Sequence, residues 1–284
     1  MNWCESISKA IEYIENNLTN DITVEDIAKK LYLSPFYFQK GFSIVCGYGV
    51  GEYIRNRRLS VAASELLQTD HKIIDIALKY GYDSPDSFTK AFTRFHGSTP
   101  TAVRRGEKIK EFAPLKINLT LKGGYTVEYK IKEKEAFKIV GFKDSIKYET
   151  AHEEIPKVWK RFFLKKGFSK IDAKYAVNID NNMSGDEFSY IIGDDYNPKC
   201  NIPKNFEIVE IPKFTWAVFS CTGPANLKMF ELNEKIFKEW LPNSNEYEIA
   251  TGYNIEMYSD PKDYKKGIDD EKYSCEIWIP VKRK

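Results

Sequence analysis

A nine-residue phrase occurs twice in this chain, as SPFYFQKGF at residues 34–42 and as SPDSFTKAF at residues 84–92. In each copy the serine can cap a helix, and the proline suits the first helical position, where a missing N–H costs nothing. Gly47 and Gly97 follow at matching distances and predict the two helix ends. The sequence therefore predicts two equivalent capped helices.

The repeat extends upstream of both phrases. Ile-Ala at residues 27–28 corresponds to Ile-Ala at residues 76–77, and each pair lies in a short helix that precedes a capped helix. The two phenylalanines of each phrase are four residues apart and would anchor one helix face in a core. Residues 52–67 contain no Gly or Pro and predict a connecting helix. We therefore expect an all-α tandem helix-turn-helix domain.

The face of each capped helix opposite its phenylalanines would be free, and its side chains can contact bases or phosphates. A connecting helix of about 25 Å would space the two capped helices for successive major grooves, roughly 34 Å apart on slightly bent DNA. The alternative to a DNA-binding domain is a helical bundle whose polar faces are only solvated. The matched second copy of the phrase argues against this alternative. The candidate DNA-binding residues are Phe36, Gln39, Lys40, Arg55, Arg58, Asp86, Ser87, Thr89, Lys90 and Arg94.

The stretch from IAKKLYLSPFYFQKGF through EYIRNRRLSVAASELL to IIDIALKYGYDSPDSFTKAFTRFHGSTPTAVR resembles the DNA-binding domain of AraC/XylS-type transcription regulators. The resemblance implies two recognition helices, double-stranded DNA as a partner and RNA polymerase as a further partner. By position it gives base contacts to Phe36, Gln39 and Lys40 in the first helix. It gives them to residues 85–87 and Lys90 in the second.

Three positions depart from the family pattern. Tyr32 stands where these domains often have a turn glycine, so the first turn is expected to differ. Asp86 would repel phosphate, although it could accept a hydrogen bond from cytosine. Pro85 removes a possible donor. The second helix is therefore expected to make fewer specific contacts than the first.

The second part of the chain alternates between apolar and polar residues from Tyr125 onward, which is typical of half-buried strands. The order strand, helix, strand, strand occurs twice, which predicts an α+β domain with two pseudo-symmetric β-α-β-β units. The predicted strands after the first lie at residues 136–142, 174–179, 187–193, 206–212, 213–223, 252–258 and 275–281, and the predicted helices at residues 155–163 and 226–241.

Two acidic residues interrupt apolar strands in this part. Glu256 shares a strand face with Tyr258, and Glu276 shares one with Trp278. A buried carboxylate is costly unless paired, and an acid among aromatic rings would suit an organic cation. Alternatively, both acids simply face water. The candidate ligand-binding residues are Glu256, Glu276, Tyr190, Trp216, Tyr258 and Trp278.

The segments YTVEYKIKEKEAFKIVGF, the helix that begins IPKVW, the TGP turn, EWLP and EIWIPVK together resemble the GyrI-like, or SOUL/SHS2-type, effector-binding domain. In Rob-like regulators this domain follows an AraC-type DNA-binding unit. The resemblance implies a pocket between the two pseudo-repeats, a key glutamate and aromatic, amphiphilic or cationic ligands, as in multidrug binding. We expect Glu256 to be that glutamate and keep Glu276 as the second choice.

Residues 1–107 are therefore expected to form the DNA-binding domain, residues 108–120 a linker and residues 121–284 the effector-binding domain. No apolar run approaches the ~20 residues of a membrane helix, and the N-terminus does not resemble a secretory signal. Five cysteines without a CxxC pair predict no disulfide framework, no metal and no cofactor. A reducing cytoplasm is the expected location.

These features predict a sequence-specific transcription regulator that binds a small effector. An alternative is that the second domain is a small-molecule hydrolase using a pocket glutamate as general base, although no Ser/His/Asp or Cys/His arrangement is visible. A third reading is a DNA-binding protein whose second domain only binds other proteins. The sequence leaves the DNA target, the effector, the direction of regulation and the oligomeric state open.

Overall fold

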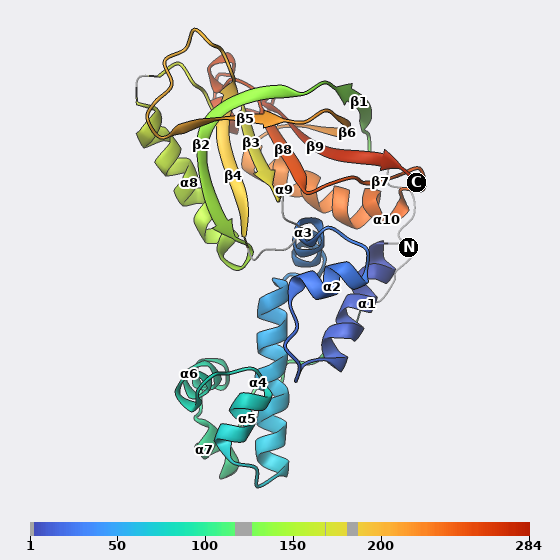
Figure 1. The fold of residues 1–284 in the computed structure, drawn as a ribbon, viewed down its shortest axis with the longest axis vertical. Coiled ribbons are helices and arrows are strands. Elements are labelled where there is room, and N and C mark those ends of the chain that lie inside the picture. Colours follow the sequence, from blue (N-terminus) through green and yellow to red (C-terminus); the bar gives the residue numbers. More distant parts are fainter. Residues whose placement is uncertain (1–2, 117–126, 168, 181–186) are drawn as a thin grey trace. The chain divides into compact units, whose positions relative to one another are not determined.

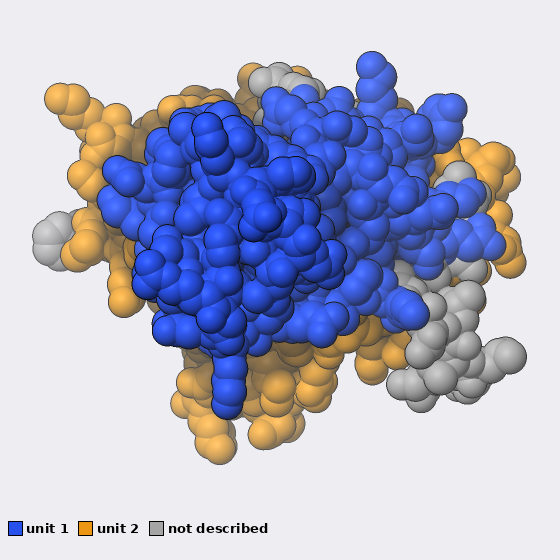
Figure 2. Space-filling view, turned by 90° about the horizontal axis from the view of Figure 1, so that it is seen from below, with its two compact units in different colours: residues 1–33, 46–120 blue, residues 34–45, 121–284 orange. Residues whose placement is uncertain are grey.

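The computed structural model describes residues 3–116, 127–167, 169–180 and 187–284 (Figure 1). The chain forms two compact units (Figure 2). The first contains residues 1–33 and 46–120, and the second contains residues 34–45 and 121–284. Residues 117–126, which hold the end of the predicted linker and the start of the first predicted strand, lie outside the described residues.

The first unit is helical, and its helices confirm the predicted connecting helix and the second helix-turn-helix pair. A hydrophobic core lies between α4, α5, α6 and α7, where Phe88 and Phe92 are fully buried and their rings pack at a tilt of 52° with centroids 5.3 Å apart. The helices are α1 (Trp3–Asn16), α2 (Val24–Lys30), α4 (Val50–Gln68), α5 (Ile73–Lys79), α6 (Pro85–His96) and α7 (Pro100–Arg104).

The local signals act at these helix ends as the sequence predicts. The Ser84 hydroxyl accepts a hydrogen bond from the Ser87 N–H at 3.2 Å, which caps α6. Gly97 ends α6 with φ +85°, and Gly47 has φ +78°. Thr23 caps α2 and exchanges hydrogen bonds with Asp26. Each capping interaction satisfies an N–H group that the helix itself leaves free.

Residues 107–116 have no helix or strand but lie along α4. The Phe112 N–H donates to the Ser60 hydroxyl at 3.0 Å, and the Phe112 ring packs 5.9 Å from the Tyr53 ring. The Leu115 N–H donates to the Tyr53 hydroxyl at 3.1 Å. The start of the predicted linker is thus tied to the first unit, and the proposed boundaries at residues 107 and 120 stay a prediction.

The second unit is built on one large antiparallel sheet with the strand order β1-β6-β9-β8-β3-β4-β2-β5, and β7 pairs with β9. The strand β7 was not predicted from the sequence; the other strands match predicted segments. The strands are β1 (Lys130–Lys134), β2 (Phe137–Lys147), β3 (Tyr175–Ile179), β4 (Glu187–Asp195), β5 (Phe206–Ile211), β6 (Phe214–Thr222), β7 (Tyr247–Ile249), β8 (Tyr253–Tyr258) and β9 (Ser274–Arg283).

The strand order confirms the predicted pseudo-symmetry. One half reads β5-β2-β4-β3 and the other reads β1-β6-β9-β8, so the two halves meet at the antiparallel β3–β8 pair. Each half receives its edge strand from the other half of the sequence: β1 precedes β2 but pairs with β6, while β5 precedes β6 but pairs with β2. This exchange ties the two repeats into a single sheet.

Helices α8 (Ala151–Lys166) and α9 (Ala225–Lys235) lie against the same side of the curved sheet (Figure 1). A π-helical turn at Ile236–Trp240 continues α9 and leads into α10 (Leu241–Asn243). The second unit also includes nearly all of α3 (Pro35–Cys46), the first of the two capped helices. The opposite side of the sheet forms a core of its own around Trp216 and Trp278, whose ring centroids are 6.0 Å apart.

Candidate functional site

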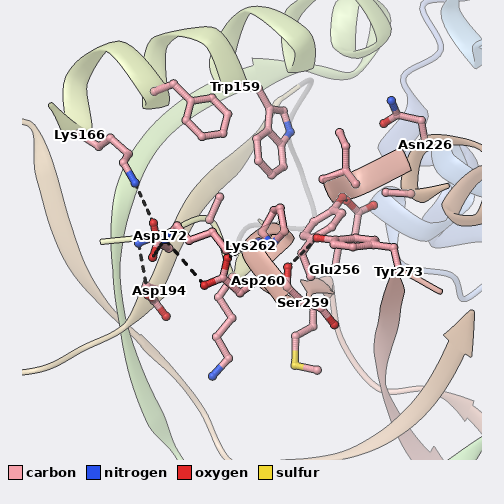
Figure 3. A pocket seen from close by; sticks show the side chains of 18 of the residues that line it. Trp159, Lys166, Asp172, Asp194, Asn226, Glu256, Ser259, Asp260, Lys262 and Tyr273 are labelled. Atoms are coloured by element: carbon pink, nitrogen blue, oxygen red, sulfur yellow. Dashed lines mark hydrogen bonds and ion pairs between the residues drawn. The ribbon is translucent and has the colours of Figure 1, made fainter. Parts of the chain in front are cut away.

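A cavity of about 1140 Å³ lies in the second unit between α8, the start of α9 and strands β4 and β8, with the segment after β8 at its edge (Figure 3). Ile155, Trp159 and Phe163 follow one another at four-residue spacing along α8 and form an apolar wall. Tyr190 from β4 and Glu256 from β8 line the wall across from them. The cavity therefore lies between the two pseudo-repeats of the sheet, where the resemblance to the GyrI-like domain implies a pocket.

Glu256 is held within an aromatic cage. The Tyr258 hydroxyl donates to Glu256 Oε2 at 2.9 Å, and the Trp159 indole N–H donates to the Tyr190 hydroxyl at 3.1 Å. The Trp159 and Tyr258 rings meet edge to face at 5.6 Å. Burial and then the Glu256 carboxylate raise the pKa of both tyrosines well above 10, so both remain neutral phenols.

None of the ion pairs between described residues involves Glu256. At the far end of the cavity, Asp172 differs from Glu256 because it is paired with two lysines. The Lys166 ammonium lies 2.8 Å from Asp172, and the Lys262 ammonium lies 3.5 Å from the same carboxylate (Figure 3). The hydrogen bond from Lys166 lowers the pKa of Asp172, which keeps it ionised. Glu256 thus has no direct cationic partner among the described residues. Asp194, which also lines the cavity, has none either, but its carboxylate accepts hydrogen bonds from the backbone N–H groups of Asp172 and Asp195.

The predicted ligand residues divide into two groups. Glu256, Tyr190 and Tyr258 line the cavity together, whereas Trp216 and Trp278 lie in the core on the opposite side of the sheet. Glu276 stays with the second group, since it accepts a hydrogen bond from the Trp278 indole at 2.7 Å. Both predicted face-sharing pairs, Glu256 with Tyr258 and Glu276 with Trp278, are confirmed.

Ile155, Trp159 and Phe163 line the cavity but are not among the ligand-binding residues expected from the sequence. A helix is predicted at residues 155–163, with none of its side chains assigned to the ligand. It has two apolar stripes, because Val158 and Phe162 are fully buried under the sheet while Trp159 and Phe163 turn to the cavity. The sequence does contain a signal for these cavity residues. The helix has a second apolar stripe in addition to the one that packs on the sheet.

The second capped helix presents its predicted DNA-contacting side chains to solvent. Asp86, Ser87, Lys90 and Arg94 are exposed along α6, and Thr89 is half-buried. These residues form the free helix face that the phenylalanine anchors predict. They satisfy the first requirement of a groove-reading helix, which is access.

The two candidate arginines on α4 differ. Arg55 is exposed. Arg58 is half-buried, and its guanidinium donates to the backbone carbonyls of Leu18 at 2.8 Å and Asn20 at 2.7 Å. Arg58 therefore fixes the end of the α1 segment, and its contact with phosphate stays a prediction.

The first capped helix is surrounded differently. Phe36 is only 3 % exposed, and its ring lies 6.0 Å from Phe188 on β4. The half-buried Lys40 donates to the Asn254 side-chain oxygen at 3.1 Å, and Gln39 is also half-buried. The prediction of a free face on this helix is therefore wrong in this structure, because strands β4 and β8 occupy that face.

Among the described residues, no group of three or more His, Cys, Asp or Glu side chains gathers in a way that could hold a metal ion. In the same part of the chain, the search for a helix long and apolar enough to span a bilayer finds none.

Residues 130–281 match the family model described as integron-associated effector binding protein (Cass2), and residues 27–106 match a helix-turn-helix domain model. The HTH-type transcriptional activator AarP of Providencia stuartii is 43 % identical over 98 residues, which cover 34 % of this chain and 73 % of AarP. The regulatory protein SoxS of Salmonella typhimurium is 39 % identical over 98 residues, which cover 34 % of this chain and 92 % of SoxS.

A longer alignment joins the chain to the right origin-binding protein of Escherichia coli K12, at 33 % identity over 147 residues. It covers 50 % of this chain and 48 % of that protein, so the match spans about half of each. The family matches confirm the predicted order of an all-α helix-turn-helix domain and an α+β effector-binding domain. The chain belongs to the AraC-type helix-turn-helix transcription regulators and carries an effector-binding domain of the Cass2, or GyrI-like, family.

Proposed function

We propose that the cavity around Glu256 binds an aromatic or amphiphilic organic cation. One observation carries this proposal: a carboxylate without a direct cationic partner stands among the Trp159, Tyr190 and Tyr258 rings. Removing such a carboxylate from water is costly until a cation pairs with it. Aromatic faces add about 0.5–2 kcal/mol of attraction for a desolvated cation.

The size of the cavity supports a bulky ligand. Its volume of about 1140 Å³ is slightly above the usual range for small-molecule sites, about 300–1,000 Å³. The apolar stripe of α8 would cover the hydrocarbon part, while Glu256 would sit beside the charge. An anion of the same shape would lose the charge pairing and would be repelled by Glu256.

The test is calorimetric titration of the full chain with tetraphenylphosphonium and, separately, with tetraphenylborate, an anion of nearly the same shape. We expect the cation to bind and the anion to bind at least tenfold more weakly, a difference of about 1.4 kcal/mol. Glu256→Gln should remove most of this preference. Glu276→Gln is the matched control, because Glu276 lies outside the cavity, and it should leave the preference unchanged. Equal affinity for the two ions would refute the proposal.

We also propose that promoter DNA is contacted through α6, with Lys90 and Arg94 on phosphates and Ser87 and Thr89 near base edges. In anisotropy titrations with the chain's own upstream DNA, Lys90→Ala and Arg94→Ala should each reduce the salt slope by about one. Lys199→Ala, which removes an exposed lysine of the second unit, is the control. A salt slope near zero for the unmodified chain would contradict DNA binding.

RNA polymerase is proposed as a further partner, and the effector is proposed to bind without turnover. AarP is named as a transcriptional activator and SoxS as a regulatory protein, which supports both points. Chromatography of effector candidates after incubation with the chain should therefore recover them unchanged. A product that forms with the full chain but not with Glu256→Gln would instead favour the hydrolase.

A further inference from the structure

Helix α3 is packed on the effector sheet within the second unit. The Tyr37 hydroxyl donates to the backbone carbonyl of Tyr253 on β8, and Tyr37 is only 1 % exposed. The Phe36 ring lies 6.0 Å from Phe188 and 6.1 Å from Tyr148. One side of α3, with the residues expected to read DNA, is therefore buried against protein.

Lys40 brings a positive charge into this contact. Its ammonium donates to the Asn254 side-chain oxygen at 3.1 Å and lies 5.9 Å from the ring centroids of Phe36 and Phe237. Asn254 is fully buried on β8 and is two residues from Glu256, so both side chains are on the same face of the sheet.

The Glu256 carboxylate attracts the Lys40 ammonium at the sheet face that both side chains share. Burial lowers the pKa of Lys40, and attraction from the Glu256 carboxylate opposes that shift. Among the described residues, Lys40 forms no ion pair within 4.0 Å, so its ammonium is stabilised by the Asn254 amide, the Phe36 and Phe237 rings and this longer-range attraction. Glu256 consequently acts on two sides, towards α3 and towards the cavity that it lines.

We propose that the contact of α3 with the sheet is a DNA-free state and that a cation bound beside Glu256 releases α3 from it. This inference rests on the proposed function, since it takes the cavity ligand to be a cation. The bound cation cancels the field of the carboxylate at Lys40 and leaves two like charges in a region of low dielectric, where their repulsion is strong. Release then frees Gln39 and Lys40 for DNA.

Release of α3 by the cation links the binding of the cation to the binding of DNA. A ligand shifts an equilibrium only by its difference in affinity for the two states. If the cation raises DNA affinity about tenfold, or ~1.4 kcal/mol, bound DNA must raise the affinity for the cation by the same factor.

The test is hydrogen exchange of the full chain, alone and with saturating tetraphenylphosphonium or tetraphenylborate. Amides of α3 should exchange about tenfold faster with the cation and at an unchanged rate with the anion. Amides of α6 serve as the internal control, because α6 makes no part of the second unit. Calorimetry on the same samples distinguishes cation binding from the release of α3. If the cation binds but does not change the exchange rate of the α3 amides, the proposed release is wrong and the proposed function stands. A cation that does not bind overturns both.

Two substitutions at Asn254 test the docking without any ligand. Asn254→Asp places a carboxylate beside Lys40 and should slow α3 exchange, whereas Asn254→Leu removes the acceptor and should accelerate it. General destabilisation cannot change the exchange rate of α3 in opposite directions in the two variants. Faster exchange in both variants would overturn the proposal. Tyr37→Phe should also accelerate exchange. Its matched control is Tyr175→Phe, which removes a buried hydroxyl bonded to Asp195 and should leave α3 unaffected.

Discussion

Helices α3 and α6 share a capped phrase with two phenylalanine anchors, yet their surroundings differ. In α6 one face is buried through Phe88 and Phe92, and the opposite face is exposed. In α3 the equivalent anchors are buried as well, but Phe36 and Tyr37 are also buried, against the effector sheet. The positions that match Phe36 and Tyr37 in α6 are Asp86 and Ser87, which are polar and exposed.

This difference shows that one repeat can carry two kinds of information. The shared residues specify the helix and its anchoring, whereas the residues that differ specify what the other face contacts. Large apolar side chains at two of those positions in α3 are suited to a protein surface as well as to DNA. A helix that is apolar nearly all round is normally covered on more than one side.

The largest expected effect tests the shared part of the two helices. Phe42 and Phe92 are both fully buried anchors, so Phe42→Ala and Phe92→Ala should each lower the free energy of unfolding by about 3–5 kcal/mol. Denaturant unfolding curves measure both losses, and Ser43→Ala at an exposed position of α3 is the control. If one substitution lowers the free energy of unfolding by less than half as much as the other, the two anchors do not stabilise their helices equally.

The next largest effect concerns α2 and α5, the helices that precede α3 and α6. In the second copy, the Lys79 ammonium lies 2.7 Å from the Glu65 carboxylate on α4. The matching lysine of the first copy, Lys30, lies instead over the Tyr13 ring, 4.9 Å from its centroid. Only the second copy thus joins its two helices through an ion pair at this position.

Glu65 should make stability depend on acid pH. Burial by itself raises the pKa of Glu65, but hydrogen bonds from Lys79, His71 and Tyr80 outweigh it and lower the pKa to about 2. Since the folded pKa is depressed, the stabilisation is complete above about pH 4.5 and is lost as the pH falls towards about 2. The loss amounts to roughly 3 kcal/mol. Between these pH values, the free energy of unfolding should fall more steeply with decreasing pH in the unmodified chain than in Glu65→Gln. The same pH dependence in both proteins would contradict the low pKa of Glu65.

Local features of both copies could be predicted from the sequence, because periodicity, caps and glycines act over a few residues. The pairing of Glu256 with Tyr258 is of this kind, since the two residues are neighbours on one strand face. The contact of Lys40 with Asn254 is not, because 214 positions separate the two residues and only the folded sheet brings them together. The exchange of β1 and β5 between the halves is long-range in the same way.

Trp216 and Trp278 illustrate a second limit of predicting the ligand site from the sequence. The central strands are covered on both faces, so apolar residues occur on both, and alternation alone does not say which face meets the cavity. The aromatic residues of β6 and β9 were therefore grouped with Glu256, although they pack on the opposite side of the sheet. Trp159 was missed for a related reason, because an apolar helix stripe can face a cavity as well as a core.

A smaller effect compares the turns before the two capped helices. Tyr32 was expected to change the first turn, but it adopts the left-handed conformation with φ +56°, close to the +79° of Gly81 in the second turn. This conformation costs a residue with a side chain of order 1 kcal/mol, and Tyr32 is 92 % exposed, so its ring contributes little packing. Tyr32→Gly should therefore stabilise the chain by up to about 1 kcal/mol.

Gly81→Ala is the converse change in the second turn. An added Cβ would lie 2.6 Å from a nitrogen of the Arg58 guanidinium, and the positive φ is unfavourable for alanine. We expect a loss of about 1–2 kcal/mol in unfolding measurements. If Tyr32→Gly destabilises the chain instead, the exposed tyrosine has a role that the geometry of the turn does not explain.

The smallest effect concerns the two serines that begin the shared phrase. The Ser84 hydroxyl accepts from the Ser87 N–H, whereas the Ser34 hydroxyl is buried without a hydrogen-bond partner among the described residues, so the predicted side-chain cap forms only in the second copy. Ser84→Ala should cost about 1 kcal/mol, the usual value of a lost cap. Ser34→Ala should cost almost nothing, because the group it removes makes no bond to lose. Thermal unfolding of the two variants measures the difference, and equal losses would show that both serines cap their helices, which would make the two copies more alike than their surroundings suggest.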